Sequence, residues 1–244
     1  MTSPIILLHG WGLSSAVWAP LQAALDPGLS VGALDLPGHG SAAPAGSQLQ
    51  DWSDAVLAQL PACCILVGWS LGAQLALHIA HRHPARVDRL VLISATPRFV
   101  QADGWPAAMP ATTLADFRRS FDADPAGTQR RFIALQGLGD SRRRTVLSAL
   151  GSATTPADEA HRAALADGLG LLESTDLRRL VPEIRQPVRL LHGGGDTLMP
   201  GAAAEWLADS LPDGCLSTFS DSGHAPFLSR PRDCASLIEG FARD

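Results

Sequence analysis

The sequence predicts an α/β fold, in which a mostly parallel sheet is flanked by helices. Short apolar runs alternate along the chain with longer segments that have the length and periodicity of helices. The runs are continuously apolar and do not alternate with polar residues, which is typical of strands buried on both faces of a parallel sheet. In an open sheet of this kind, a functional site forms at the carboxyl ends of the strands.

Six apolar runs are the predicted strands, and most of them end in Gly, Asp, His or Ser: Ile5–Leu8, Ser30–Leu34, Cys63–Val67, Leu90–Ile93, Val188–Leu191 and Leu216–Phe219. The segments Ser47–Leu60 and Gly72–His83 are predicted helices. The uncharged stretch Ala55–His81 is long enough to cross a bilayer, but proline and glycine interrupt it. It therefore predicts a strand, a tight turn and a helix, with no membrane association.

The alternation breaks at about Arg98 and resumes at about Val181. The intervening segment has helical composition and proline-rich joints, so we expect a helical cap at residues 98–181 on a core of residues 1–97 and 182–244. Arg98–Leu150 holds eight Arg and five Asp, although the whole chain has a net charge of −5. Its arginines cluster at 118–119, 130–131 and 142–144. These clusters have two possible interpretations at this point: a solvated helix face, or a surface that binds an anionic partner.

Composition excludes several functions and suits one compact domain with an insertion, expected to be a monomer. All 19 basic residues among the 244 are Arg, so chemistry that needs a lysine Schiff base or a P-loop lysine is excluded. A mildly acidic chain is a poor candidate for nucleic-acid binding. The four cysteines lack CxxC spacing, which argues against a zinc site. The sequence shows neither a metal-ligand cluster nor a dinucleotide-binding motif, so we expect no metal and no cofactor. Residues 1–4 lack the basic start of a signal peptide, so we expect a cytoplasmic protein.

The strongest motif is Gly68-Trp69-Ser70-Leu71-Gly72, which follows a predicted strand and opens a predicted helix. In that context G-x-S-x-G is a nucleophile elbow, a sharp turn that exposes a serine above the sheet. The flanking glycines are needed because side chains there would collide with the adjacent strand and helix. The motif predicts that Ser70 is a nucleophile.

A serine nucleophile needs a base and an acid that orients the base, in the chain order Ser, Asp or Glu, His. Asp196 and His224 fit, because each follows a predicted strand at the same sheet edge as Ser70. Asp221 is close to His224 in sequence and is a weaker candidate. His9, His39 and His192 are more simply interpreted as structural residues in turns.

Acyl transfer also requires hydrogen-bond donors for the negatively charged oxygen of the intermediate. We expect these to be the backbone N–H groups of Leu71, after the nucleophile, and of Trp11, in the loop after the first strand. Leu13, Trp69 and Phe132, together with the Trp11 ring, are predicted to line the acyl site. This apolar lining favours an aliphatic acyl group.

With these motifs the chain resembles the α/β-hydrolase superfamily and, within it, the carboxylesterases of biotin synthesis. The resemblance rests on Leu7–Leu13 with Val17-Trp18, on 35–38 and on 68–72 in the predicted core. It extends to His224–Phe227 and, in the cap, to Pro97, Trp105-Pro106, Arg131–Gln136 and Gly168–Arg178. The match thus covers nearly the whole chain, including the region where superfamily members usually diverge.

The resemblance implies Ser70, Asp196 and His224 as a catalytic triad and hydrolysis of the methyl ester of pimeloyl-acyl-carrier protein. It also implies that cap arginines hold the acidic carrier, with Arg131 and Arg144 at two of the family's positions. Gly127 and Ser148 stand at two other positions where the family has arginine. A broad short-chain carboxylesterase, a thioesterase, a lyase of menaquinone synthesis and a non-catalytic binding module are the alternatives.

Overall fold

The computed structural model describes residues 2–243 and contains a six-stranded sheet in the order β2-β1-β3-β4-β5-β6. Every neighbouring pair is parallel, which confirms the predicted fold class. The strands are β1 (Ile5–Leu8), β2 (Val31–Leu34), β3 (Cys64–Trp69), β4 (Val87–Ile93), β5 (Val188–Gly193) and β6 (Gly214–Phe219). Strands β3 to β6 are longer than the apolar runs predicted, because backbone pairing continues through polar residues such as Arg89 and His192.

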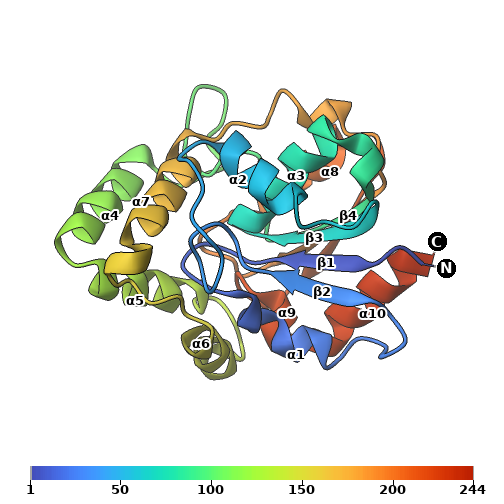
Figure 1. Ribbon diagram of the computed structural model, residues 1–244, viewed down its shortest axis with the longest axis horizontal. Helices are drawn as coiled ribbons and strands as arrows, with labels where there is room; N and C mark the ends of the chain where they lie inside the picture. The colour runs from blue at the N-terminus through green and yellow to red at the C-terminus, as the bar shows by residue number, and fades with distance from the viewer. Residues whose placement is uncertain (1, 244) are drawn as a thin grey trace.

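Helices cover both faces of the sheet (Figure 1). One face packs against α2 (Leu49–Leu57), α3 (Leu71–Arg82) and α8 (Gly201–Ser210), and the other against α1 (Ala19–Gln22), α9 (Pro226–Ser229) and α10 (Pro231–Arg243). Short 3₁₀ turns lie at Ser15–Trp18, Pro84–Arg86 and Val181–Glu183. The core therefore has two apolar layers, with β1, β3 and β4 between them. None of the helices within residues 2–243 is both long enough and apolar enough to cross a membrane.

Four helices between β4 and β5 lie beyond the carboxyl ends of the strands (Figure 1). They are α4 (Ala111–Ala123), α5 (Pro125–Gln136), α6 (Arg143–Ser152) and α7 (Glu159–Ser174), and we call residues 98–181 the cap segment. Its two ends meet where the Leu177 N–H donates to the Pro97 carbonyl over 2.8 Å. This closure favours the predicted division of the chain into core and cap.

Local sequence signals explain where the cap helices begin. The Asp124 side chain accepts a hydrogen bond from the Gly127 N–H, and Pro125 occupies the first position of α5. The Asp158 side chain likewise accepts hydrogen bonds at the start of α7. Both arrangements satisfy N–H groups that have no partner inside the helix.

The end of α2 is held by the half-buried Arg86, which precedes β4. Its guanidinium donates hydrogen bonds to the carbonyls of Leu57, Leu60 and Pro61 over 2.8–3.3 Å. These carbonyls lie at and just beyond the helix terminus, where the backbone dipole favours a positive charge. One side chain thus joins the α2 layer to the sheet.

We predict that Arg86→Met lowers the free energy of unfolding by about 2 kcal/mol, because three carbonyls lose a charged donor. Ester hydrolysis at a temperature well below unfolding stays unchanged. Urea unfolding of both proteins measures the effect, with Arg82→Met as the control, because Arg82 is exposed and makes no ion pair with a described residue. Equal stability of the Arg86 and Arg82 variants would contradict the role given to Arg86.

Candidate active site

Ser70 occupies a strained turn between β3 and α3. Its backbone angles are φ 57° and ψ −118°, a conformation that residues with a side chain rarely adopt. A Cβ atom on Gly68 would lie 2.4 Å from the Gly72 carbonyl oxygen, and one on Gly72 would lie 2.4 Å from the Leu8 oxygen. Both contacts are impossible, so the turn requires glycine on both sides of the serine. This is the geometry of the nucleophile elbow.

The two predicted oxyanion donors flank this turn. Leu71 is the first residue of α3, so its N–H has no acceptor within the helix. Trp11 follows Gly10, whose backbone passes so close that a Cβ there would be 3.2 Å from the Ser70 Cβ. The β1 loop, residues 9–14, therefore lies directly against the serine.

Asp196 and His224 form a buried pair at the ends of β5 and β6. The distance between His224 Nδ1 and Asp196 Oδ2 is 2.8 Å, and both side chains are almost fully buried. The other carboxylate oxygen accepts the N–H groups of Leu198 and Met199 at 2.9 and 3.0 Å. Burial opposes ionisation of Asp196, but attraction to His224 and these hydrogen bonds outweigh it and lower the pKa of Asp196. The carboxylate is therefore fixed and charged.

The geometry of this pair suits the predicted role of His224 as a base. The bond to the carboxylate keeps the proton on Nδ1, so Nε2 carries a free lone pair. Nε2 is buried and has no hydrogen-bond partner within residues 2–243. The indole N–H of Trp69 donates to the His224 carbonyl over 2.8 Å, which ties the histidine to the residue before Ser70. The three predicted triad residues thus lie at the same edge of the sheet: His224 and Asp196 are hydrogen bonded, whereas the structure shows no hydrogen bond between His224 Nε2 and Ser70 among residues 2–243.

Comparison with known proteins agrees with this geometry. The model of the alpha/beta hydrolase family matches residues 5–237. The chain belongs to the α/β hydrolase family. It is 52% identical to a pimeloyl-[acyl-carrier protein] methyl ester esterase of Aromatoleum aromaticum, over 98% of each chain. It is 35% identical to a protein of the same name from Nitrosomonas europaea, over 97% of this chain and 94% of the other.

Two solved α/β hydrolase structures support the fold. An esterase from Exiguobacterium antarcticum has a TM-score of 0.84 at 22% identity and covers 100% of this chain and 94% of its own. The enol-lactonase from Burkholderia xenovorans has a TM-score of 0.84 at 20% identity and covers 100% and 93%. At this identity the similarity concerns the fold alone.

In this α/β hydrolase, the four predicted lining residues fall into two groups. Trp11 and Phe132 pack edge to face, with ring centroids 5.0 Å apart, among further aromatic rings of the cap segment, Phe117 and Phe121. Leu13 and Trp69 lie in the other core layer and are fully buried there. The cap side of the site is therefore aromatic, while Trp69 supports the histidine from within the core.

Two of the alternatives to the predicted acid and base already have partners, and a third, His192, is buried and neutral. His9 donates from Nδ1 to the Gly10 carbonyl at 2.8 Å and accepts the Leu36 N–H at 3.0 Å, which is a structural role. Asp221 pairs with Arg230. Burial lowers the pKa of His192, which lies near the Asp196 carboxylate and stays neutral.

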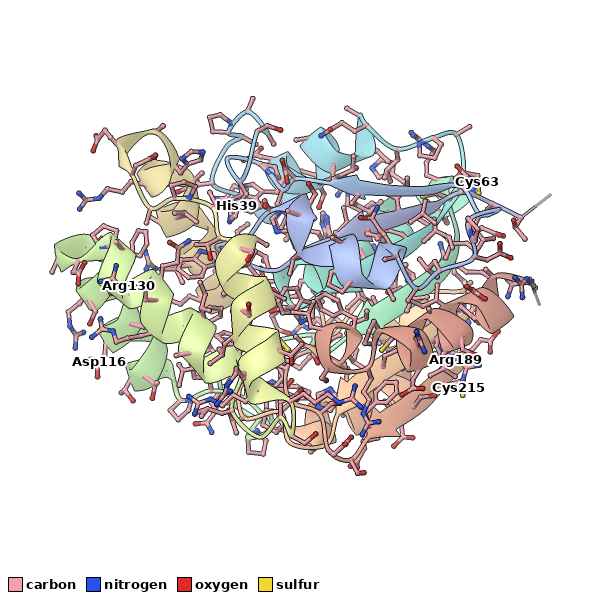
Figure 2. All side chains as sticks on the ribbon, turned by 90° about the horizontal axis from the view of Figure 1, so that it is seen from below. His39, Cys63, Asp116, Arg130, Arg189 and Cys215 are labelled. Carbon is pink, nitrogen blue, oxygen red and sulfur yellow. The ribbon has the colours of Figure 1, made fainter. Side chains whose placement is uncertain are left out.

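The cap arginines differ in their partners. Arg131 on α5 and Arg144 on α6 are exposed and form no ion pair with any described carboxylate, like three neighbours, Arg130, Arg142 and Arg143. Figure 2 shows Arg130 on the cap helices, at the opposite end of the molecule from Arg189. Gly127 and Ser148 lie on these same two helices.

Two residues of the cap segment that our sequence analysis missed contact the β1 loop. Gln129 and Thr155 are buried and hydrogen bond to the backbone of Gly12 and Leu13. The sequence could have indicated Gln129, because it precedes Phe132 by three residues and therefore shares the face of α5 that packs inward.

We predict that Asp196→Asn lowers kcat for p-nitrophenyl butyrate by about 10³- to 10⁴-fold, because an amide no longer fixes the imidazole tautomer. Steady-state hydrolysis at pH 7.5 measures this loss. Asp221→Asn is the control, because this acid pairs with Arg230 outside the site. The assignment is wrong if the Asp221 variant loses activity and the Asp196 variant keeps it.

Two buried histidines, His9 in the β1 loop and His39 beside it, make stability depend on pH. Burial lowers the pKa of His9 to about 4 and, together with the nearby His9, lowers the pKa of His39 to about 3. Both values lie below the unfolded value of 6.5, so the unfolded chain takes up protons first as the pH falls. We predict that the free energy of unfolding decreases below pH 6.5 by about 1.4 kcal/mol per pH unit for each histidine. Urea unfolding at pH 7, 6 and 5 measures how the free energy of unfolding changes with pH. The variant His39→Gln should lose the contribution of one histidine to this slope. A free energy of unfolding that does not change with pH would contradict the prediction.

Proposed function

We propose that the protein is a serine carboxylesterase that hydrolyses the methyl ester of pimeloyl-acyl-carrier protein. The observation that carries the proposal is the buried His224–Asp196 pair, which leaves Nε2 of His224 without a partner at the same sheet edge as the strained Ser70 turn. The backbone carbonyl of His224 accepts a hydrogen bond from Trp69, the residue before Ser70. The two relatives named above, matched along nearly their whole length, bear the name of this activity. Within residues 2–243, no cluster of His, Cys, Asp or Glu suits a metal ion.

In the first half of the reaction, His224 Nε2 removes the proton from the Ser70 hydroxyl as the oxygen attacks the ester carbonyl carbon. The carbonyl oxygen becomes negative and accepts hydrogen bonds from the N–H groups of Leu71 and Trp11. The Asp196 carboxylate stabilises the imidazolium that forms. His224 then gives its proton to the departing methoxide, and methanol leaves an acyl group on Ser70.

In the second half, water takes the place of methanol. His224 removes a proton from water as the oxygen attacks the acyl-enzyme carbonyl, and the same donors hold the negative oxygen. The imidazolium returns the proton to Ser70, which releases the free carboxylic acid. We propose that the acyl chain binds against the rings of Trp11 and Phe132, which are buried against each other, because such an apolar environment suits an aliphatic chain.

The exposed arginines of α5 and α6 are the proposed docking surface for the acidic carrier. Elsewhere in the cap segment, Arg98, Arg118 and Arg119 pair with carboxylates of this chain. The five arginines at 130–131 and 142–144 have no such partner among the described residues, so their charge is free to attract an acidic surface. Arg131 and Arg144 represent the two helices in the test.

We predict that Arg131→Ala and Arg144→Ala each lower kcat/KM for pimeloyl-acyl-carrier protein methyl ester by about threefold to tenfold, because docking loses a charge. The loss is greater at low salt, where screening is weaker. Hydrolysis of p-nitrophenyl butyrate, which needs no carrier, stays at the wild-type rate.

The matched control is Arg185→Ala, since Arg185 is equally exposed but precedes β5 at the opposite edge of the sheet. It leaves both substrates unaffected. Equal wild-type rates on the two substrates, with no effect of any arginine, would instead indicate a broad short-chain carboxylesterase.

A further inference from the structure

A single glutamine of the cap segment reaches into the β1 loop. Gln129 projects from α5 and is 4% exposed. Its amide nitrogen donates to the Gly12 carbonyl over 2.8 Å and to the Thr155 carbonyl over 2.7 Å. The two N–H bonds of one amide are thus both directed at backbone oxygens, which leaves no donor for a substrate.

The Gly12 carbonyl is held from a second direction as well. The Thr155 N–H donates to it over 3.0 Å, and the Thr155 hydroxyl donates to the Leu13 carbonyl over 2.7 Å. Gly12 itself has φ +77°, a conformation that only glycine adopts easily. Residues of the cap segment, including an antiparallel bridge between Thr154 and Leu13, therefore satisfy a stretch of loop backbone that the six-stranded sheet does not reach.

The loop backbone that Gln129 and Thr155 hold lies next to the proposed oxyanion donor. Gly12 directly follows Trp11, whose N–H is a proposed oxyanion donor, and Gly10 packs against Ser70. The Trp11 ring is fixed separately, because its indole N–H donates to the Leu165 carbonyl of α7 over 2.8 Å. Gly10, on the amino side of Trp11, thus packs against the nucleophile turn, and the Gly12–Leu13 peptide, on the carboxyl side of Gly12, is held by Gln129.

We propose that Gln129 is a positioning residue that sets the oxyanion hole, acting through the Gly12 carbonyl. The proposal rests on the function proposed above. Displacing a donor by a fraction of an ångström weakens its bond to the oxyanion, which forms only during reaction, and affects ground-state binding much less. Arg130 and Arg131 follow Gln129 on α5. The helix that is proposed to bind the carrier therefore also positions the proposed oxyanion hole.

The test uses Gln129→Met, which keeps the length of the side chain and removes both donors. Its matched control is Gln186→Met, because Gln186 is also buried and donates to two backbone carbonyls, those of Ala80 and Pro84, over 3.0 and 3.4 Å. That site lies before β5, away from the catalytic edge. Both variants are assayed with p-nitrophenyl butyrate and with an alkyl trifluoromethyl ketone, whose hemiketal oxyanion with Ser70 occupies the same hole.

For Gln129→Met we expect kcat to fall about tenfold to a hundredfold with KM within about twofold of wild type. The inhibition constant for the trifluoromethyl ketone rises by a matching factor. Gln186→Met loses a similar amount of stability but keeps kcat and the inhibition constant. If both variants lose activity equally, or if only KM changes for Gln129→Met, the positioning role is wrong.

The comparison requires a variant that folds. Thr155→Val is therefore included as a second and milder change in the same contact. It removes the hydroxyl donor to the Leu13 carbonyl and retains the N–H donor to Gly12. A smaller loss in kcat, again with unchanged KM, is expected, and an unchanged kcat would count against the proposal. Failure of the wild-type protein to hydrolyse any ester would overturn the proposed function itself, whereas wild-type activity with an unaffected Gln129 variant overturns only this inference.

Discussion

The strained backbone of Ser70 is the constraint on which the rest of the site depends. A serine at φ 57° persists only where its surroundings hold it more tightly than its own preference opposes it. Parallel pairing of β3 with β1 and β4 holds the chain up to Trp69, and the Ser70 N–H donates to the Ile93 carbonyl over 3.1 Å. Glycines at 68 and 72 leave room for the turn. The sheet therefore fixes the backbone of Ser70, the proposed nucleophile, and the other site residues lie on the elements around it.

Each partner of the serine is fixed by a different layer of the molecule. The Asp196 carboxylate is fixed by the turn after β5, and the His224 backbone by the indole of Trp69 in the core. The β1 loop depends on the cap segment, through Gln129, Thr155 and the α7 carbonyl that receives the Trp11 indole. The proposed base and nucleophile thus belong to the core, while the proposed oxyanion hole belongs jointly to core and cap. A carrier that docks on the cap as proposed would therefore be connected to the proposed oxyanion hole through Gln129 and Thr155.

Much of this could be predicted from the sequence, because the strongest constraints are local. Buried parallel strands appear as continuous apolar runs, and the elbow appears as two glycines around a serine. The contacts of Gln129 could not be predicted, because they join residues 117 positions apart and depend on how α5 packs. The same limit applies to Trp69 and Trp11, whose rings fall in different layers although both flank the serine.

The central claim is that Ser70 is an activated nucleophile, and covalent labelling tests it most directly. A fluorophosphonate probe transfers its phosphonyl group to a serine whose proton is removed as fluoride leaves. Peptide mass spectrometry of the treated protein should locate one phosphonyl group per chain on Ser70, with the label abolished in Ser70→Ala and strongly reduced in His224→Ala. An unlabelled protein, or equal labelling of wild type and the His224 variant, would contradict the account.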